Sequence, residues 1–330
     1  MNRNRFRLHD KVIAVAAENP IIEETLVEAV LYKSAQPTDE QAADLLLAYH
    51  VVDALPNVPE GASHITTHDE TIKIFHLDDE YFLSHENAFV HINPEQAVAR
   101  GKFLKPMLEA DMQLTRFYLV TIAVLILLRY QHRYALHAAA LVNNDAGVLL
   151  VARSGSGKST SALNLVRAGW EHLSDDTVLL RRNGSDAVEA LSFRHDFCVK
   201  HSMVEQFPEL GSKDWPPSLS DPEKWRVNLD ELYPGQFRER CIPRVVLMPT
   251  IVDEPQSELK EVPAATVLQH LSNQGGALLT PRQKVVQEHF NVLRDLINQV
   301  DCYQLLAGRD AIDEPDATAE LVSSVLPEQK

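Results

Sequence analysis

The sequence contains few cysteines, three in 330 residues. Cys198, Cys241 and Cys302 are odd in number and far apart, which fits neither a disulfide framework nor the spacing of a cysteine metal site. We therefore expect them to be small buried side chains in a protein of the reducing cytoplasm.

No apolar run is long enough to cross a membrane. The best candidate, Phe117–Leu128, has 12 residues between Arg116 and Arg129, whereas a span needs about 20. The basic first residues, 1–12, are not followed by the apolar segment of a secretory signal. The pattern predicts a core helix over residues 107–131 and no membrane contact.

Positive charge is also scarce, with 47 acidic against 31 basic residues and a net charge of −16. Such a surface disfavours binding to nucleic acid or to an anionic membrane over a broad face. An anionic ligand would need a local positive pocket. The hydrophobic fraction of 45% is ordinary for a soluble globular protein, and the length allows about two domains.

The hydrophobic pattern divides the chain into two parts. Residues 1–60 carry apolar side chains at helical spacing and predict a few helices, whereas residues 70–94 alternate in short runs typical of a β-meander. We expect an N-terminal α+β region over residues 1–105 and an α/β domain over residues 106–330.

The second part alternates strand and helix signals. Two apolar runs, 138–142 and 148–151, flank a turn signal and predict a hairpin. A helix is expected over 158–168 and a buried strand over 244–248. The segment 208–236 is rich in proline, tryptophan and charge, and we expect it to form a long loop.

The strongest local signal is Val148–Thr160, where an apolar strand leads into a glycine-rich turn that opens a helix. The amides of such a turn converge on an anion, and Gly155 and Gly157 permit its close approach. In a phosphate loop Lys158 reaches the β- and γ-phosphates and Ser159 ligates Mg²⁺. The alternative is a purely structural turn. The predicted nucleotide-binding residues are Ser154, Gly155, Ser156, Gly157, Lys158, Ser159 and Thr160.

Two acidic residues and a histidine join Lys158 as candidate catalytic residues. Asp175 and Asp176 lie 17 and 18 residues after Lys158, at the end of a predicted strand. One carboxylate can bind Mg²⁺ and the other can accept the proton of an attacking hydroxyl. Ser159 and Asp175 are the candidate metal ligands, and the sequence leaves open which aspartate has which role. An exposed turn is the alternative. His137 begins a strand and can orient one aspartate, or serve only as a structural hydrogen-bonding group.

Together, His137, the loop Ser154–Ser159, Gly169 and the pair Asp175-Asp176 resemble the HPr serine kinase/phosphorylase family. The resemblance covers residues 137–180. The wider group, which includes phosphoenolpyruvate carboxykinase, shares the phosphate loop and the acid pair. It implies a P-loop core with a mixed sheet, ATP and Mg²⁺ as ligands, and a histidine that assists the acidic base. In that family the base activates a serine hydroxyl.

The chain departs from the family pattern at several places. Ala138 follows the histidine where the family has glycine, Ala152 opens the loop where the family has glycine, and Thr160 replaces a family glutamate. Residues 200–215 carry no glycine-rich second signature, which that family links to phosphorolysis. We therefore expect a related kinase, with neither HPr as its substrate nor the reverse reaction as a main activity.

The favoured function is ATP-dependent transfer of the γ-phosphoryl group to a hydroxyl, on Ser or Thr of a peptide or small protein. The alternatives are a small-molecule kinase and a nucleotide-binding regulatory module. Lys224, Arg226 and Arg244 are candidate phosphate or substrate contacts, or else salt-bridged surface residues. Arg153 is expected to point away from the loop. A homo-oligomer is compatible with the sequence, and the acceptor and the role of residues 1–100 stay open.

Overall fold

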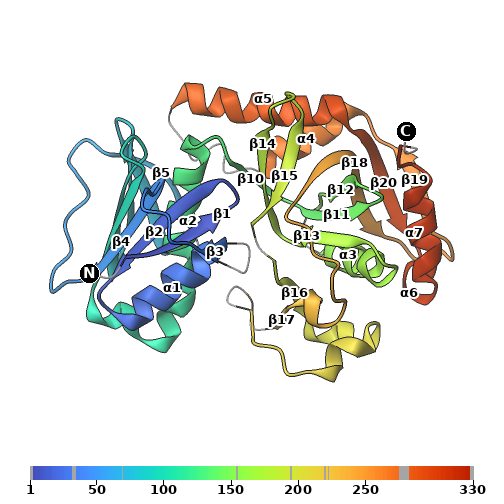
Figure 1. Ribbon diagram of the computed structural model, residues 1–330, viewed down its shortest axis with the longest axis horizontal. Helices are drawn as coiled ribbons and strands as arrows, with labels where there is room; N and C mark the ends of the chain where they lie inside the picture. The colour runs from blue at the N-terminus through green and yellow to red at the C-terminus, as the bar shows by residue number, and fades with distance from the viewer. Residues whose placement is uncertain are drawn as a thin grey trace. The chain divides into compact units, whose positions relative to one another are not determined.

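A computed structural model describes residues 3–31, 35–68, 70–153, 155–193, 195–218, 221, 223–274 and 282–327. The architecture is mixed α/β with two large mixed sheets (Figure 1). As far as the chain is described, contacts divide it into two compact units, residues 1–134 with 278–286 and residues 135–277 with 287–330. This division lies after the apolar helix, whereas the boundary expected from the sequence lies before it, near residue 105.

The first unit is built on one nine-stranded sheet. Its elements are β1 Arg3–Leu8, β2 Lys11–Ala17, α1 Pro20–Leu31, β3 Ala35–Pro37, β4 Leu45–Val51, β5 Ser63–His68, β6 Ile72–Leu77, β7 Glu80–His85, β8 Ala88–Asn93, β9 Val98–Phe103 and α2 Gln113–Tyr130. The strand order is β3-β1-β2-β4-β9-β8-β7-β6-β5, and β4 pairs in parallel with both β2 and β9. Helix α1 packs on β1 and β2, α2 packs on β8 and β9, and the two helices contact each other. They therefore cover the same face of the sheet.

The helices expected over residues 1–60 are mostly strands, and only α1 is a helix. In β2 the apolar residues from Val12 to Ala16 are buried consecutively, and in β4 Leu45, Leu47 and Tyr49 are buried in alternation. Both strands lie inside the sheet, where residues two apart share a face. The sequence pattern was ambiguous because short apolar runs fit a buried strand as well as a helix.

The predicted β-meander is confirmed. Strands β6, β7 and β8 pair antiparallel in chain order through two-residue turns. The predicted apolar helix is confirmed as α2, preceded by two 3₁₀ turns at Lys105–Leu108 and Ala110–Met112. By length and composition alone, Ala110–Tyr130 is one described helical segment that could cross a membrane. Many of its side chains are buried in the first unit, however, as in the core helix of a folded domain.

The second unit contains the other nine-stranded sheet, shown in green to red in Figure 1. Its strands are β10 Tyr134–His137, β11 Ala139–Asn143, β12 Ala146–Leu150, β13 Glu171–Ser174, β14 Thr177–Arg182, β15 Val188–Ser192, β18 Arg240–Ile251, β19 Glu258–Glu261 and β20 Asp301–Ala307. Its helices are α3 Lys158–Arg167, α4 Ala264–Gln274, α6 Asp310–Asp313 and α7 Pro315–Ser323, together with α5 Gln283–Gln299 from residue 287 onward. The main path is β10-β14-β15-β18-β12-β11-β13, and β20 joins β18 and β19.

The predicted hairpin, helix and buried strand of this unit are confirmed as β11–β12, α3 and β18. β18 runs parallel to both β12 and β20, so the carboxyl ends of these three strands meet at one edge. Helix α3 packs on β11 and β18, and Leu163 and Val166 join Leu141, Val148 and Val245 in the buried core. This packing fixes the segment between β12 and α3 at the carboxyl edge of the sheet.

The segment 208–236 is more ordered than the predicted long loop. It contains the 3₁₀ turns Pro208–Ser212 and Leu229–Glu231 and the strand β17 Lys224–Val227, which pairs with β16 Phe197–Lys200. Trp215 is buried and its indole donates to the Leu210 carbonyl at 2.8 Å. The apolar residues of the segment anchor it to the core beside α3. The polar composition of the segment therefore did not predict that its apolar side chains pack in the core.

The cysteines are only partly as expected. Cys241 and Cys302 are buried, but Cys198 is half-buried in β16. Cys198 lines a cavity in the second unit.

Candidate functional site

The glycine-rich segment after β12 forms a tight turn into α3. Gly155 and Gly157 both have left-handed backbone conformations, with φ of 83° and 97°, which side chains with a Cβ rarely adopt. A Cβ at Gly157 would lie 2.7 Å from Ile251 at the end of β18. Ser156 closes the turn, since its hydroxyl donates to the Arg153 carbonyl at 2.6 Å. Ser154, the first predicted nucleotide-binding residue, lies outside the described residues.

The N-terminus of α3 opens at this turn. Gly157 is the N-cap residue, and no described side chain caps the helix. The first amides of a helix lack partners within it and carry a partial positive charge, so they attract an anion. Lys158 at the first helical position sends its ammonium group to the Asp175 carbonyl, where β13 ends. Ser159 and Thr160 follow in the first turn and line the same cavity as Lys158.

Asp175 is buried directly beside this loop. Its side chain is 2% exposed, and Oδ2 accepts the Cys198 backbone N–H at 2.9 Å. Within the described part of the chain, Oδ1 has no hydrogen-bond partner. Burial raises the pKa of Asp175 from 3.8 to about 6, although Lys158 lowers it in part. A buried carboxylate oxygen without a partner is costly, and a cation beside it would remove that cost.

Asp176 forms a polar cluster with His137. The Nδ1 atom of His137 lies 3.2 Å from Oδ1 of Asp176, and the two side chains are 41% and 33% exposed. The other carboxylate oxygen accepts the Thr177 hydroxyl at 2.7 Å. The buried Ser174 hydroxyl accepts the amides of Asp176 and Thr177, which fixes the turn between β13 and β14. An imidazole in this position can hold the Asp176 carboxylate in one orientation.

These groups line one cavity of about 320 Å³. Its walls include all the predicted catalytic residues and the described loop residues other than Ser156. Of the predicted phosphate contacts, Lys224 lines the cavity, and its ammonium lies 3.2 Å from Asp221. Arg226 lies 3.9 Å from Asp196, away from the lining. Arg244 is exposed in the first half of β18, and the structure does not bring it to the cavity.

The cavity is lined by two cationic residues that were not predicted from the sequence as contacts, Lys200 and Arg153. Lys200 is the register partner of the predicted Lys224 across β16 and β17, and both lysines line the cavity. Arg153 also lines it, which contradicts the expected outward orientation. With Lys158 these side chains form the local positive pocket that an anion would need in a chain of net charge −16. The only sequence signal for Lys200 was its place at the end of a short apolar run.

A second cavity also borders the loop, through Arg153 and Ser156. It has a volume of about 410 Å³ and is lined by Val151, Ala152, Met248 and Pro249, with Arg153 shared with the first cavity. The rest of the lining is Val262 and a set of polar side chains, namely Ser156, Thr250, Thr266, His270 and Gln304. A cavity of this volume with a mixed lining can hold a small organic molecule.

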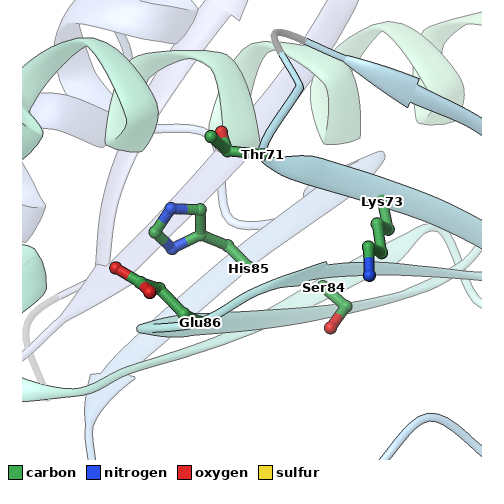
Figure 2. Close-up of a pocket in the computed structure, with 5 residues that line it drawn as sticks. All are labelled: Thr71, Lys73, Ser84, His85 and Glu86. Carbon is green, nitrogen blue, oxygen red and sulfur yellow. The ribbon is translucent and has the colours of Figure 1, made fainter.

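The first unit has a separate pocket of about 470 Å³ between β6 and β7 (Figure 2). Figure 2 shows Lys73 and Ser84 side by side on adjacent strands, away from His85 and Glu86. Burial lowers the pKa of His85, and its Nδ1 accepts the Asn87 amide at 3.1 Å. The turn after β7 therefore fixes the His85 ring through the Asn87 amide. The residues that line this pocket do not include a pair of acids or a glycine loop like those of the second unit.

Comparison with known proteins gives a match to a family model and similarities to solved structures. The family described as SynChlorMet cassette protein ScmC matches residues 103–201 of this chain. The solved structure of the HPr(Ser) kinase/phosphatase from Coxiella burnetii is similar over 58% of this chain and 88% of its own, with 11% sequence identity and a TM-score of 0.32. No curated protein matches the sequence at a significant level.

Proposed function

We propose that the protein is a kinase that transfers the γ-phosphoryl group of ATP to a hydroxyl on Ser or Thr of a peptide or small protein. The observation that carries this proposal is the composition of one cavity. The glycine turn with Lys158, the buried Asp175 and the pair of Asp176 with His137 all face it. A nucleotide-binding module without catalysis would need only the first of these three features.

The phosphates of ATP would bind at the N-terminus of α3. The open amides of the helix, the conformations of Gly155 and Gly157 and the Lys158 ammonium together suit a polyphosphate. Lys200 and Lys224 face them from β16 and β17 and add charge. The second cavity, which shares Arg153 with the first, has a volume and a mixed apolar and polar lining that would suit the nucleoside.

Mg²⁺ fits the donors beside the loop. The Oδ1 atom of Asp175 is buried without a hydrogen-bond partner among the described residues, and Ser159 is in the first turn of α3 beside the same cavity. Carboxylate and hydroxyl oxygens are ligands that Mg²⁺ prefers. We assign Asp175 and Ser159 as its protein ligands. When bound, the ion would supply charge neutralisation at the β,γ-bridge.

Asp176 would then serve as the base. It is more exposed than Asp175 and so can reach a hydroxyl that enters from solvent, and His137 orients its carboxylate. The acceptor oxygen attacks the γ-phosphorus while the bond from phosphorus to the bridging oxygen of ADP breaks. The hydroxyl proton passes to the Asp176 carboxylate, and ADP leaves with the bridging oxygen.

A single-turnover assay with γ-labelled ATP and a fractionated cell lysate tests this function. We expect label in the peptide and protein fraction of the wild type. Both Lys158→Ala and Asp176→Asn should lower transfer by at least about 100-fold. Arg244→Ala, whose side chain lies outside the cavity, is the matched control and should transfer at the wild-type rate.

The distribution of label decides between acceptors. Label confined to the small-molecule fraction would replace the peptide acceptor with a metabolite, while ATP binding without any transfer would overturn the kinase assignment. The Mg²⁺ dependence separates the two aspartates, because Asp175→Asn should raise the Mg²⁺ concentration needed for half-maximal rate and Asp176→Asn should not. A cytoplasmic location, where ATP is available, belongs to the same proposal.

A further inference from the structure

Two histidines and an aspartate converge in the second unit, outside the cavity described above. His172 is in β13, His195 follows β15, and Asp230 is in the 3₁₀ turn Leu229–Glu231. Each side chain offers one potential metal-ligating atom, and the three atoms lie within 4.8 Å of one another. Residues from three distant chain segments therefore share one small volume.

The buried polar atoms of this cluster are poorly satisfied by the protein. His172 is 0% exposed, and neither of its ring nitrogens has a hydrogen-bond partner among the residues that the structure describes. The same holds for Oδ1 of Asp230. His195 is 5% exposed, and its Nε2 lies 3.2 Å from Oδ2 of Asp230. Leaving a buried polar group without a partner is unfavourable, so the arrangement favours a ligand that engages these atoms.

Neighbouring residues hold the two rings in place. The His195 ring stacks on Phe237, with centroids 3.8 Å apart and planes 13° apart. The backbone of His172 is fixed on both sides, since its amide donates to Gln236 at 2.7 Å and its carbonyl accepts the Arg238 amide at 2.9 Å. The imidazoles are thus positioned before any ligand arrives, which is the property of a built site.

We propose that His172, His195 and Asp230 bind one Zn²⁺ ion. Two imidazole nitrogens and one carboxylate oxygen form a donor set that suits Zn²⁺ better than Mg²⁺ or Ca²⁺, which prefer oxygen ligands alone. Ligands of a tetrahedral zinc ion lie about 3.3 Å apart. The three side chains therefore need to close by at most about 1.5 Å from the observed 4.8 Å.

The surroundings of the cluster give it an access route. His172 and His195 are buried, at 0% and 5% exposure. The Asp230 side chain is 35% exposed, which leaves a solvent route to the site and a coordination position for water. The two histidines supply the inner side of the site.

A bound ion would connect two segments that hold Asp175. His172 lies three residues before Asp175, and His195 lies three residues before Cys198, whose amide donates to the Asp175 carboxylate at 2.9 Å. Cross-linking His172 to His195 would fix the distance between those segments. The zinc ion would therefore have a structural role behind the Asp175 side chain.

The test uses the full-length chain without an affinity tag, so that no added histidines bind metal. Protein is stripped with a chelator, dialysed against Zn²⁺ and analysed for metal content and Zn²⁺ affinity, without nucleotide or Mg²⁺. We expect one tightly bound zinc per chain. His195→Gln and Asp230→Asn should each weaken the affinity by about 100-fold or more. His64→Gln removes an exposed histidine of the first unit and is the matched control.

A spectroscopic measurement identifies the ligands. Replacement of zinc by Co²⁺ should give the visible absorption of a four-coordinate ion in the wild type and in His64→Gln, and this absorption should be lost in His195→Gln. Circular dichroism verifies that the variants are folded, and an unfolded His195→Gln leaves the decision to Asp230→Asn. Absence of tight zinc, or unchanged affinity in a folded variant, overturns the site. The readout is metal binding, so the outcome does not depend on kinase activity.

Discussion

Replacing Asp175 by asparagine is expected to stabilise the protein at neutral pH. The carboxylate is 2% exposed, and burial raises its pKa from 3.8 to about 6 even though Lys158 lies beside it. A group whose pKa is higher in the folded state contributes stability that is fully present below the unfolded pKa. That contribution is lost as the pH rises through the folded value. The wild type therefore loses stability between about pH 4 and about pH 6, and Asp175→Asn should not lose this part.

The size of the effect follows from the two pKa values. An increase from 3.8 to about 6 corresponds to about 3 kcal/mol between the two protonation states. The wild type loses most of this free energy of unfolding as the pH rises from about 4 to about 8. The stability of the variant relative to the wild type should therefore increase by about 2–3 kcal/mol over that range. The amide oxygen of asparagine can still accept the Cys198 N–H, so the main hydrogen bond of the side chain is retained.

Urea unfolding followed by circular dichroism measures this difference. The titration is carried out at several pH values without Mg²⁺ or nucleotide, because a bound cation would stabilise the ionised Asp175. Asp53→Asn, at an exposed position, is the control for removing one negative charge from the chain. The quantity to compare is the free energy of unfolding of Asp175→Asn minus that of the wild type. If this difference is the same at every pH, or is smaller at about pH 8 than at about pH 4, burial does not raise the pKa of Asp175 and the reasoning is wrong.

Three further substitutions test other parts of the structure. Gly101→Ala would place a Cβ 2.0 Å from the buried Tyr49 ring. It should lower the free energy of unfolding in urea by about 3 kcal/mol. An unfolding midpoint equal to that of the wild type would contradict the contact between β4 and β9. Gly157→Ala combines a left-handed φ of 97° with a Cβ 2.7 Å from Ile251, and a loss of about 1–2 kcal/mol is expected. Unchanged stability would show that the turn adopts another conformation. His137→Gln should reduce kcat by up to about 100-fold with little change in KM for ATP. If KM for ATP rises instead and kcat/KM falls by the same factor, His137 contributes to nucleotide binding.

Local sequence patterns predicted much of the second unit. The apolar runs around the turn at residues 143–147 predicted the hairpin, and the glycine at position 169 predicted the end of α3. The same patterns predicted that the glycine-rich loop, His137 and the acid pair belong to one site. The structure places them around one cavity. Their roles in binding and catalysis stay predictions. These features were predictable because each depends on residues close together in the chain.

The first unit was less predictable from its sequence. The run Leu45–Val51 is almost entirely apolar, and such a run fits a helix or a buried strand equally well. Its parallel partners, β2 and β9, lie about 30 and 50 residues away in the chain, so only long-range pairing selects the strand. Arg244 was predicted from the sequence to be either a phosphate contact or a surface residue. It is exposed in the first half of β18, before the carboxyl edge of the sheet, and is not among the residues that line the cavity.

The sequence alone determined which chemical groups the candidate site contains: a glycine turn, one helix-initiating lysine, two adjacent carboxylates and a histidine. Only the tertiary structure decided how their environments differ. Asp175 and Asp176 are neighbours of the same type, yet one is buried against Cys198 and the other faces His137. Likewise, His172, His195 and Asp230 have no recognisable spacing in the chain. Burial and proximity between distant segments arise from packing, which a local pattern does not encode.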